Sequence, residues 1–411
     1  MATPGAVGKA FRSVAFSLKT VRMKPARRIL QVTDWLPPDF GAVGQYALQD
    51  ARGWAREGAD VLLLGLGMER AGWEVEDCPP GSLAILRLPA LDYERSRWGV
   101  RAIWIAAVHL RLLVAAARFL PSVDEVRCSE SPPFLVYPLT WLARRHGVRL
   151  VYRLTDVFPE VLWAEHGGIP PKGLGWLQRA VARFRKGLDC IEVLGEDARE
   201  RLLELGVAPE RVVVRRDGPP IPIRGDEPPS DRPEVLQGKV VLLYSGNFGV
   251  AHEDETVLEG LAHHHHHGSG RVALWLNATG TKAGPLAARL RARGVPVAWT
   301  PPVALSALPF LLRAADAHLI TLRDPFVGLV LPSKVYAILA LGGPLLFVGS
   351  AKSDVARLAT RELPPERFFR VDVGDVLGFA QALEVLADRF SSGAAPSRVS
   401  STSKGLCCCP K

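Results

Sequence analysis

A lysine near the start of a short predicted helix is the first side chain with a clear chemical use. The sequence GLVLPSKVYAILALGGP spans residues 328–344, where Pro332 suits a first helical turn and Gly342 suits a C-cap. Ser333 and Lys334 then lie beside unpaired backbone N–H groups and the positive end of the helix dipole. This arrangement favours a bound phosphate. From this segment alone, a solvated surface lysine is an equally good interpretation.

Two short apolar runs flank this helix and predict buried strands. They are AHLITL at 317–322 and PLLFVG at 344–349, so the unit is strand, loop, helix, strand. In such a unit the helix begins above the carboxyl end of a parallel sheet, which is where ligands bind.

A second loop suited to an anion follows a predicted strand at 240–244. Its small and polar members are Ser245, Gly246, Asn247 and Gly249. Backbone N–H groups of such a loop can line a diphosphate, and His252 is a further possible donor.

The first predicted crossover also has glycines at its turn. A strand at 29–33 leads into FGAVG, with Gly41 and Gly44, and then into a helix. The loop can bring N–H groups to a phosphate or sugar, but it lacks the spacing of the dinucleotide fingerprint. Glycines that only permit a tight turn are the alternative interpretation.

Two carboxylates follow the predicted strand at 149–154. Asp156 and Glu160 occur in TDVFPE, at the edge where a parallel sheet binds ligands. A carboxylate there can accept a proton from a hydroxyl or stabilise positive charge on a sugar ring. The alternatives are a helix cap for Asp156 and a surface charge for Glu160.

Alternating strand and helix patterns predict two consecutive α/β domains. A proline-rich stretch without periodicity, DGPPIPIRGDEPPSDRP, separates them. The predicted segments are a basic arm at 1–27, disordered or membrane-interfacial, a first domain at 28–216, a linker at 217–233, a second domain at 234–375, a C-terminal helix at 376–390 and a disordered tail at 391–411.

Composition narrows the class of protein without deciding the ligand. The chain has 411 residues, 48% of them hydrophobic, and a net charge of +9. A basic face suits phosphorylated substrates, anionic lipid or nucleic acid, but no nucleic-acid-binding motif accompanies the charge. Six cysteines, three of them at 407–409, form neither a disulfide framework nor metal-ligand spacing, which favours a reducing cytoplasm.

No segment of the sequence predicts a transmembrane helix. The most apolar run, 100–120, is interrupted by three arginines and a histidine. The helix predicted at 97–119 either dips into a membrane interface or is a buried crossover helix.

A run of five histidines at 263–267, followed by Gly-Ser-Gly, resembles an expression tag. We expect it to form an exposed loop between a helix and a strand and not a metal site.

Across residues 29–390 the chain resembles the bacterial GT-B glycosyltransferases of the family-four type, and in particular the polysaccharide or O-antigen sugar transferase subgroup. The resemblance rests on FGAVGQYALQDARGWAREGADVLLL, LLYSGNFGVAHEDETVLEG, GLVLPSKVYAILALGGPLLFVG and VDVGDVLGFAQAL. The segment from Asp156 to Glu160 is similar to the subgroup's Asp-aromatic-Trp-Pro-Glu.

The resemblance implies an α/β protein with two Rossmann-like domains that face each other across a cleft, and a C-terminal helix that returns to the first domain. It places the acceptor in the first domain and the nucleotide sugar in the second. The donor-binding residues that it implies are Gly44, Ser245, Gly246, Asn247, Gly249, His252, Gly280, Lys282, Ser333 and Lys334. Asp156 and Glu160 become the catalytic candidates, with Asp156 orienting the acceptor.

The implied activity is transfer of a hexose, with retention, from a nucleotide diphosphate sugar to a lipid-linked glycan in cell-surface polysaccharide synthesis. The donor is expected to be a UDP-sugar, the acceptor polyprenyl-linked, and the protein peripheral at the cytoplasmic, anionic face of the membrane. No cofactor or metal is implied, and the chain contains no Asp-x-Asp.

The chain departs from the family at two positions. Many relatives carry two glutamates spaced eight apart around the helix at 334, where this chain has Leu329 and Ala337. The donor sugar is therefore open. A sugar-nucleotide epimerase on the same fold, or a non-catalytic subunit that binds nucleotide sugar, are the alternatives.

Overall fold

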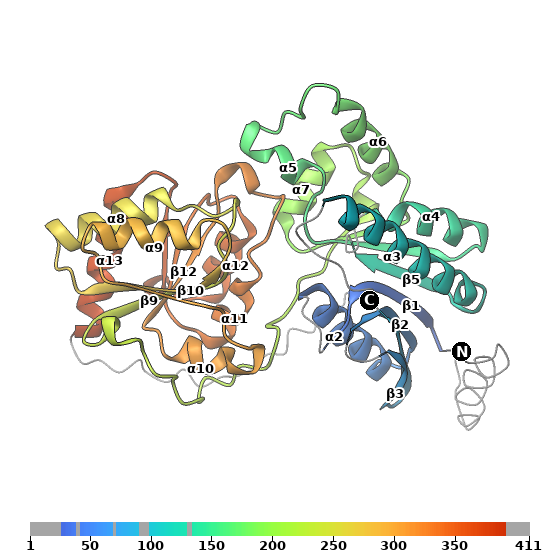
Figure 1. Cartoon of the computed structure of the whole chain (residues 1–411), viewed down its shortest axis with the longest axis horizontal. Coiled ribbons are helices and arrows are strands. Elements are labelled where there is room, and N and C mark those ends of the chain that lie inside the picture. Colours follow the sequence, from blue (N-terminus) through green and yellow to red (C-terminus); the bar gives the residue numbers. More distant parts are fainter. Residues whose placement is uncertain (1–25, 38–41, 69–70, 90–97, 130–133, 392–411) are drawn as a thin grey trace. The chain divides into compact units, whose positions relative to one another are not determined.

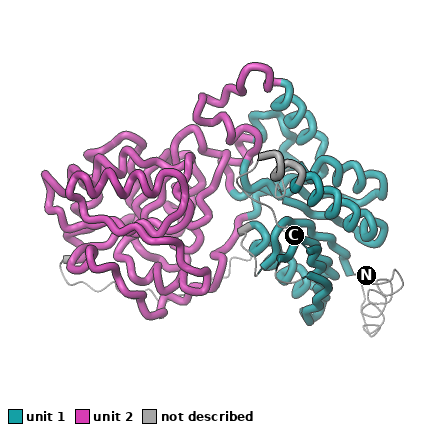
Figure 2. The backbone as a smooth tube through the Cα atoms, in the orientation of Figure 1, with its two compact units in different colours: residues 1–156, 176–194, 202–215 teal, residues 157–175, 195–201, 216–411 magenta. Residues whose placement is uncertain are grey.

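The computed structural model describes residues 26–37, 42–68, 71–89, 98–129 and 134–391. The chain divides into two compact units (Figure 2). Unit 1 consists of residues 1–156, 176–194 and 202–215, and unit 2 consists of residues 157–175, 195–201 and 216–411.

Unit 1 contains an eight-stranded sheet in the order β3-β4-β2-β1-β5-β6-β7-β8. Neighbouring strands are parallel except for the antiparallel pair β3 and β4. The strands are β1 (Arg28–Trp35), β2 (Asp60–Gly67), β3 (Gly72–Cys78), β4 (Gly81–Pro89), β5 (Glu125–Ser129), β6 (Arg149–Leu154), β7 (Cys190–Val193) and β8 (Val212–Val214). Central strands such as β2 are buried almost throughout, as expected for a sheet covered on both faces.

The direction of each crossover decides which face of this sheet its helix covers. The helices are α2 (Ala42–Arg56), α3 (Trp98–Phe119), α4 (Val136–Arg145), α6 (Gly175–Lys186) and α7 (Glu196–Glu204). Crossovers between parallel strands are right-handed. Because α3, α4 and α6 lead toward β8 and α2 leads the other way, α2 lies on the opposite face from these three (Figure 1).

Unit 2 contains a six-stranded parallel sheet in the order β11-β10-β9-β12-β13-β14. Its strands are β9 (Val240–Asn247), β10 (Val272–Thr279), β11 (Val297–Thr300), β12 (Ala317–Thr321), β13 (Leu345–Val348) and β14 (Phe368–Val371). Its helices are α5 (Glu160–Trp163), α8 (Glu255–His267), α9 (Ala283–Ala292), α10 (Leu308–Arg313), α11 (Lys334–Leu341), α12 (Asp354–Glu362) and α13 (Val376–Ser391). The prediction of two Rossmann-like α/β domains is confirmed.

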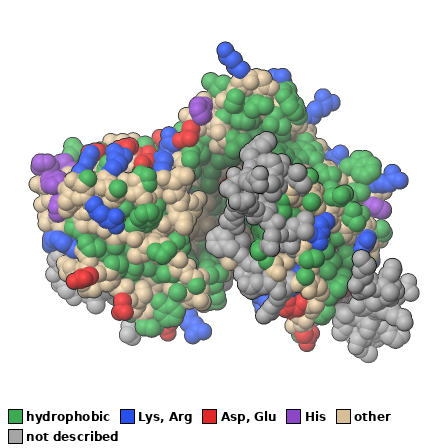
Figure 3. Space-filling model, in the orientation of Figure 1, with side chains coloured by type: hydrophobic (Ala, Val, Ile, Leu, Met, Phe, Trp, Pro, Cys, Tyr) green, Lys and Arg blue, Asp and Glu red, His purple; other side chains and the backbone are tan. Residues whose placement is uncertain are grey.

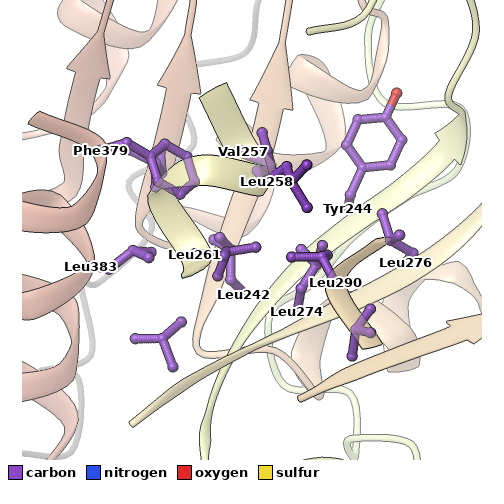
Figure 4. Packing of buried hydrophobic residues seen from close by; sticks show 14 of the residues in the cluster. Leu242, Tyr244, Val257, Leu258, Leu261, Leu274, Leu276, Leu290, Phe379 and Leu383 are labelled. Carbon is purple, nitrogen blue, oxygen red and sulfur yellow. The ribbon is translucent and has the colours of Figure 1, made fainter. Parts of the chain in front are cut away.

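The last helix does not return to the first domain, so that prediction is wrong for α13. Phe379 and Leu383 of α13 belong to the core of unit 2, where Figure 4 shows them beside Leu261 of α8. Both side chains are fully buried. The apolar stripe of α13 is therefore used within unit 2.

Two short segments belong to unit 2 although they lie within the range predicted for the first domain. Residues 157–175 are joined to unit 2 by the N–H of Val157, which donates to the carbonyl of Leu329 at 2.8 Å. Residues 195–201 are joined by the N–H of Glu196, which donates to the buried carboxylate of Asp354 at 3.1 Å. Both contacts pair residues far apart in sequence, which hydrophobic periodicity does not report.

The histidine run is not a loop. It forms the last turns of α8, and His264 is 1% exposed. Its Nε2 accepts a hydrogen bond from the N–H of Val272 at 3.1 Å, and its Nδ1 lies 2.6 Å from Oε1 of Glu384. Because Nε2 is an acceptor, the ring is neutral, and burial lowers its pKa. The expected exposed loop is therefore wrong, because the run is helical and His264 is buried in the core.

We expect His264→Ala to reduce the free energy of unfolding by about 1 to 3 kcal/mol, because the N–H of Val272 loses its buried acceptor. His267→Ala, at an exposed position of the same run, should change it by less than about 0.5 kcal/mol. Urea denaturation of both variants measures the difference. Equal midpoints would contradict a structural role for His264.

Candidate functional site

The carboxyl end of β9 carries the loop that the sequence predicts to bind an anion. The strand continues through Ser245 and Gly246 to Asn247, beyond its predicted end, because these residues pair with the last residues of β10. Asn247 is exposed, whereas Phe248 beyond it is buried in the core. The polar part of the loop therefore faces away from the core.

The turn after β10 holds this loop in place. The N–H of Phe248 donates to the carbonyl of Thr279 at 2.7 Å, and the N–H of Lys282 donates to the carbonyl of Phe248 at 3.1 Å. Gly280 has φ +105°, and a Cβ on it would lie 2.5 Å from both Asn247 Oδ1 and Phe248 O. Only glycine fits there. Gly280 thus supports the loop from beneath; a direct contact with a donor stays a prediction.

Lys282 also stabilises the structure around the candidate site. Its ammonium lies 2.7 Å from Oδ1 of Asp254 and donates to the carbonyl of His252 at 2.9 Å. Two acceptors within unit 2 therefore occupy this cation. The geometry gives Lys282 the task of fixing the segment that leads into α8.

Lys334 brings the two predicted anion-binding segments together. It is the first residue of α11, after Ser333 at the N-cap, so the helix begins two residues later than Pro332. A Cβ on Gly246 would lie 3.5 Å from Cε of Lys334 and 3.9 Å from Nζ. The ammonium is also 3.7 Å from the centre of the Tyr244 ring. Lys334 is half-buried against the loop, so the interpretation as a solvated surface lysine is wrong.

Tyr244 links the lysine to the loop, and the sequence interpretation missed it. The ammonium of Lys334 donates to the Tyr244 hydroxyl, which in turn donates to the carbonyl of Asn247 at 2.7 Å. Figure 4 shows this hydroxyl directed away from the leucines that surround the base of the ring. The sequence feature that could have indicated this role is the aromatic residue directly before Ser-Gly-Asn. Its role depends on a partner in α11.

The electrostatics of the site leave a cation among neutral neighbours. Burial lowers the pKa of Lys334 well below its usual value and raises that of Tyr244. His252 donates from Nδ1 to the carbonyl of Thr321 at 2.7 Å; burial, together with the charge of Lys334, lowers its pKa to about 3. His252 and Tyr244 are therefore both uncharged at neutral pH. An anionic ligand would supply the missing negative charge.

The two candidate catalytic carboxylates differ in environment. Asp156 follows β6 in unit 1, and its side chain reaches solvent, yet the surrounding protein removes enough hydration to raise its pKa to about 6. A carboxyl group with such a pKa suits proton transfer near neutral pH. Glu160 begins α5 in unit 2 and is 2% exposed. Its interpretation as a surface charge is therefore wrong.

Gly44 allows α2 to pack closely against the end of β1. A Cβ at this position would lie 1.6 Å from the carbonyl oxygen of Trp35, so no other residue fits. This contact accounts for the glycine by packing alone. Its approach to a donor stays a prediction, and Gly41 lies outside the described residues.

The positions where many relatives carry glutamates are apolar and buried. Leu329 is 4% exposed and Ala337 is 3% exposed. A glutamate at either place would need a polar partner inside the core. The environment of these positions thus agrees with the residues that occupy them.

Comparisons with known proteins place the chain among sugar transferases. The family model for the glycosyl transferase 4-like domain matches residues 41–218. The colanic acid biosynthesis glycosyl transferase WcaI of Escherichia coli (strain K12) is 24% identical over 352 residues, which cover 78% of this chain and 83% of WcaI.

Solved structures share the fold over most of their length. Sucrose-phosphate synthase of Thermosynechococcus elongatus superposes with a TM-score of 0.62 at 14% identity, covering 88% of this chain and 90% of the synthase. HepE of Anabaena, solved in complex with UDP and glucose, gives a TM-score of 0.56 at 14% identity, covering 88% and 90%. With two Rossmann-like units and these similarities, the chain has the GT-B fold, and its residues 41–218 match the glycosyl transferase 4-like domain.

Proposed function

We propose that this glycosyltransferase moves a hexose, with retention, from a UDP-sugar to a polyprenyl-linked glycan acceptor. The observation that carries the donor half is the enclosure of Lys334 by Tyr244 and Gly246, at the carboxyl end of β9 and the start of α11. A diphosphate there would meet an ammonium, loop N–H groups and a helix N-terminus. The UDP in the HepE structure supports the choice of nucleotide.

The proposed chemistry needs charge stabilisation more than covalent help. The bond from the anomeric carbon to the diphosphate oxygen breaks, and the acceptor oxygen bonds to that carbon on the same face. The proton of the acceptor hydroxyl passes to the departing phosphate, and UDP leaves. Negative charge grows on the diphosphate during this step, so Lys334 stabilises the transition state more than the ground state. The proposal includes no metal, because Lys334 and the loop N–H groups bind the diphosphate.

Asp156 orients the acceptor in this scheme. With a pKa of about 6, its carboxyl group is mainly ionised at neutral pH and accepts a hydrogen bond from the reacting hydroxyl. The catalytic role of Glu160, which is buried at the start of α5, stays a prediction.

Two further observations support the acceptor and the location. WcaI is named for colanic acid biosynthesis, which supports a polysaccharide product. The net charge of +9 supports binding to an anionic membrane surface, and we propose that the protein acts at the cytoplasmic face of the membrane. The apolar Leu329 and Ala337 favour, as second candidate, a subunit that binds nucleotide sugar without turnover.

A donor panel tests the proposal. The purified chain is incubated with UDP-, GDP- and dTDP-sugars, with and without polyprenyl-linked glycans, and nucleotide release and nucleotide binding are measured. We expect saturable UDP binding and UDP release that depends on acceptor. Binding without release over all acceptors would favour the non-catalytic subunit, and conversion of donor without acceptor would favour an epimerase. No response to any nucleotide would refute the donor assignment.

We expect Lys334→Met to weaken UDP binding by about 1.5 to 3 kcal/mol, the usual contribution of a hydrogen bond to a charged group. Methionine keeps most of the apolar stem that packs against Gly246 and Tyr244. Lys352→Met, at an exposed lysine of the same unit, is the matched control and should leave the affinity unchanged. Isothermal titration calorimetry measures both. Equal affinities for the two variants would remove Lys334 from the site.

UDP affinity should fall as pH rises. Burial lowers the pKa of Lys334 in the free protein, and a bound diphosphate would raise it, so binding takes up a proton between these two values. Above the free value, affinity falls by up to about tenfold per pH unit. Titrations from about pH 7 to 9, above the second phosphate ionisation near 6, measure this. Lys334→Met should lose the dependence; an unchanged pH profile would contradict the proton uptake.

A further inference from the structure

Three crossover helices of unit 1 have an unusual charge pattern. The helices α3, α4 and α6 contain no aspartate or glutamate, but nine lysines and arginines, of which Arg185 is buried. In contrast, α7 has acidic residues in its first turn and α2 contains Asp50. By the same crossover rule α7, which leads from β7 to β8, lies on this face of the sheet as well, and α3, α4 and α6 make up the acid-free part of it. They therefore form a single basic layer, which we call the α3-α4-α6 face (Figure 1).

Large apolar side chains are exposed on the same layer. Leu110 and Val114, one turn apart on α3, are 64% and 47% exposed, while Trp141 of α4 and Trp176 of α6 are 62% and 60% exposed. Figure 3 shows hydrophobic side chains next to lysines and arginines over α4 and α6. Scattered single exposures are common, but several large ones on one acid-free layer mark an interaction surface.

The exposed stripe of α3 is not needed for folding. A second stripe, formed by Val108, Leu112 and Ala116, is fully buried in unit 1. A crossover helix requires only one such stripe to cover its sheet. The exposed side chains of Leu110 and Val114 can therefore pack against an apolar environment outside the protein core.

The stretch Trp104–Ser122 is long and apolar enough to cross a membrane by length and composition, and 33% of its most apolar window is buried. Crossing would remove Val108 and Leu112 from the core, and Trp104 from its stack on Trp35 at 5.7 Å. Arg118 is exposed one turn after Val114. These features suit a helix that lies in the interface plane and not one that spans it.

We propose that the α3-α4-α6 face docks on an anionic phospholipid bilayer. Exposed tryptophans beside arginines suit the boundary between headgroups and acyl chains, where Arg145 already lies 5.9 Å from the ring of Trp141. Lys and Arg without acidic residues give the charge complementarity to anionic lipid. The inference rests on the proposed function, because it names the surface that brings unit 1 to a lipid-linked acceptor.

Vesicle co-sedimentation of the full chain tests this docking. The vesicles contain phosphatidylcholine with or without phosphatidylglycerol. We expect Leu110→Ser with Trp141→Ser to weaken binding at least about tenfold, since each side chain loses its apolar burial. Leu377→Ser with Val385→Ser, at 58% and 52% exposure on α13 of unit 2, is the matched control and should bind like the wild type.

A charge variant tests the lipid specificity. Arg145→Gln with Arg179→Gln should weaken binding to anionic vesicles about thirtyfold, at roughly 1 kcal/mol for each base near the surface. It should have little effect on neutral vesicles. UDP affinity, measured without vesicles, checks the fold of each variant. If the serine variant fails to fold, Trp176→Ser on α6 replaces it.

Several results would overturn the proposal. One is that the wild type does not bind anionic vesicles. Another is that the serine and glutamine variants bind as well as the wild type. A third is that sedimentation velocity shows self-association through the apolar face. If the wild-type chain binds anionic vesicles but does not bind UDP, only the donor proposal is refuted. The reverse result would refute only the docking.

Discussion

Within the part of the chain that the structure describes, no carboxylate pairs with the half-buried ammonium of Lys334, and the candidate site depends on this unbalanced charge. Lys334 contacts Tyr244 through its hydroxyl and its ring, and it lies against Gly246. Removing a cation from water is costly unless opposite charge compensates it, and its burial lowers the pKa of Lys334. The site is thus energetically unsatisfied when empty, and a diphosphate would relieve that cost.

The surroundings of Lys334 keep this arrangement rigid. Tyr244 donates onward to Asn247, Gly280 supports the loop from below, and Lys282 fixes the entrance to α8 through Asp254. A site that is preorganised in this way spends little binding energy on ordering its own groups. Two lysines that look equivalent in sequence therefore differ in environment, since Lys282 is paired with Asp254 and Lys334 contacts Tyr244.

The sequence predicted much of the fold and indicated the two segments that form the candidate site. Short apolar runs marked β9, β12 and β13, and Gly342 ended α11 as expected. The failures have a common physical origin. The composition of the histidine run predicts a loop, but His264 has a backbone partner in β10. The family resemblance predicts that α13 returns to the first domain, but its apolar stripe packs in the core of unit 2 with α8. Neither partner is visible in local patterns.

Local sequence by itself determined where strands end and helices begin, because hydrophobic periodicity, glycine and proline act over a few residues. It therefore located Ser245 to Gly249 and Lys334 as separate anion-binding candidates. Only the tertiary structure decided that they meet. Tyr244 and Lys334 are ninety residues apart, and the enclosure that lowers the pKa of the lysine exists only when β9 and α11 are packed together. Burial and its effect on pKa are properties of that packing.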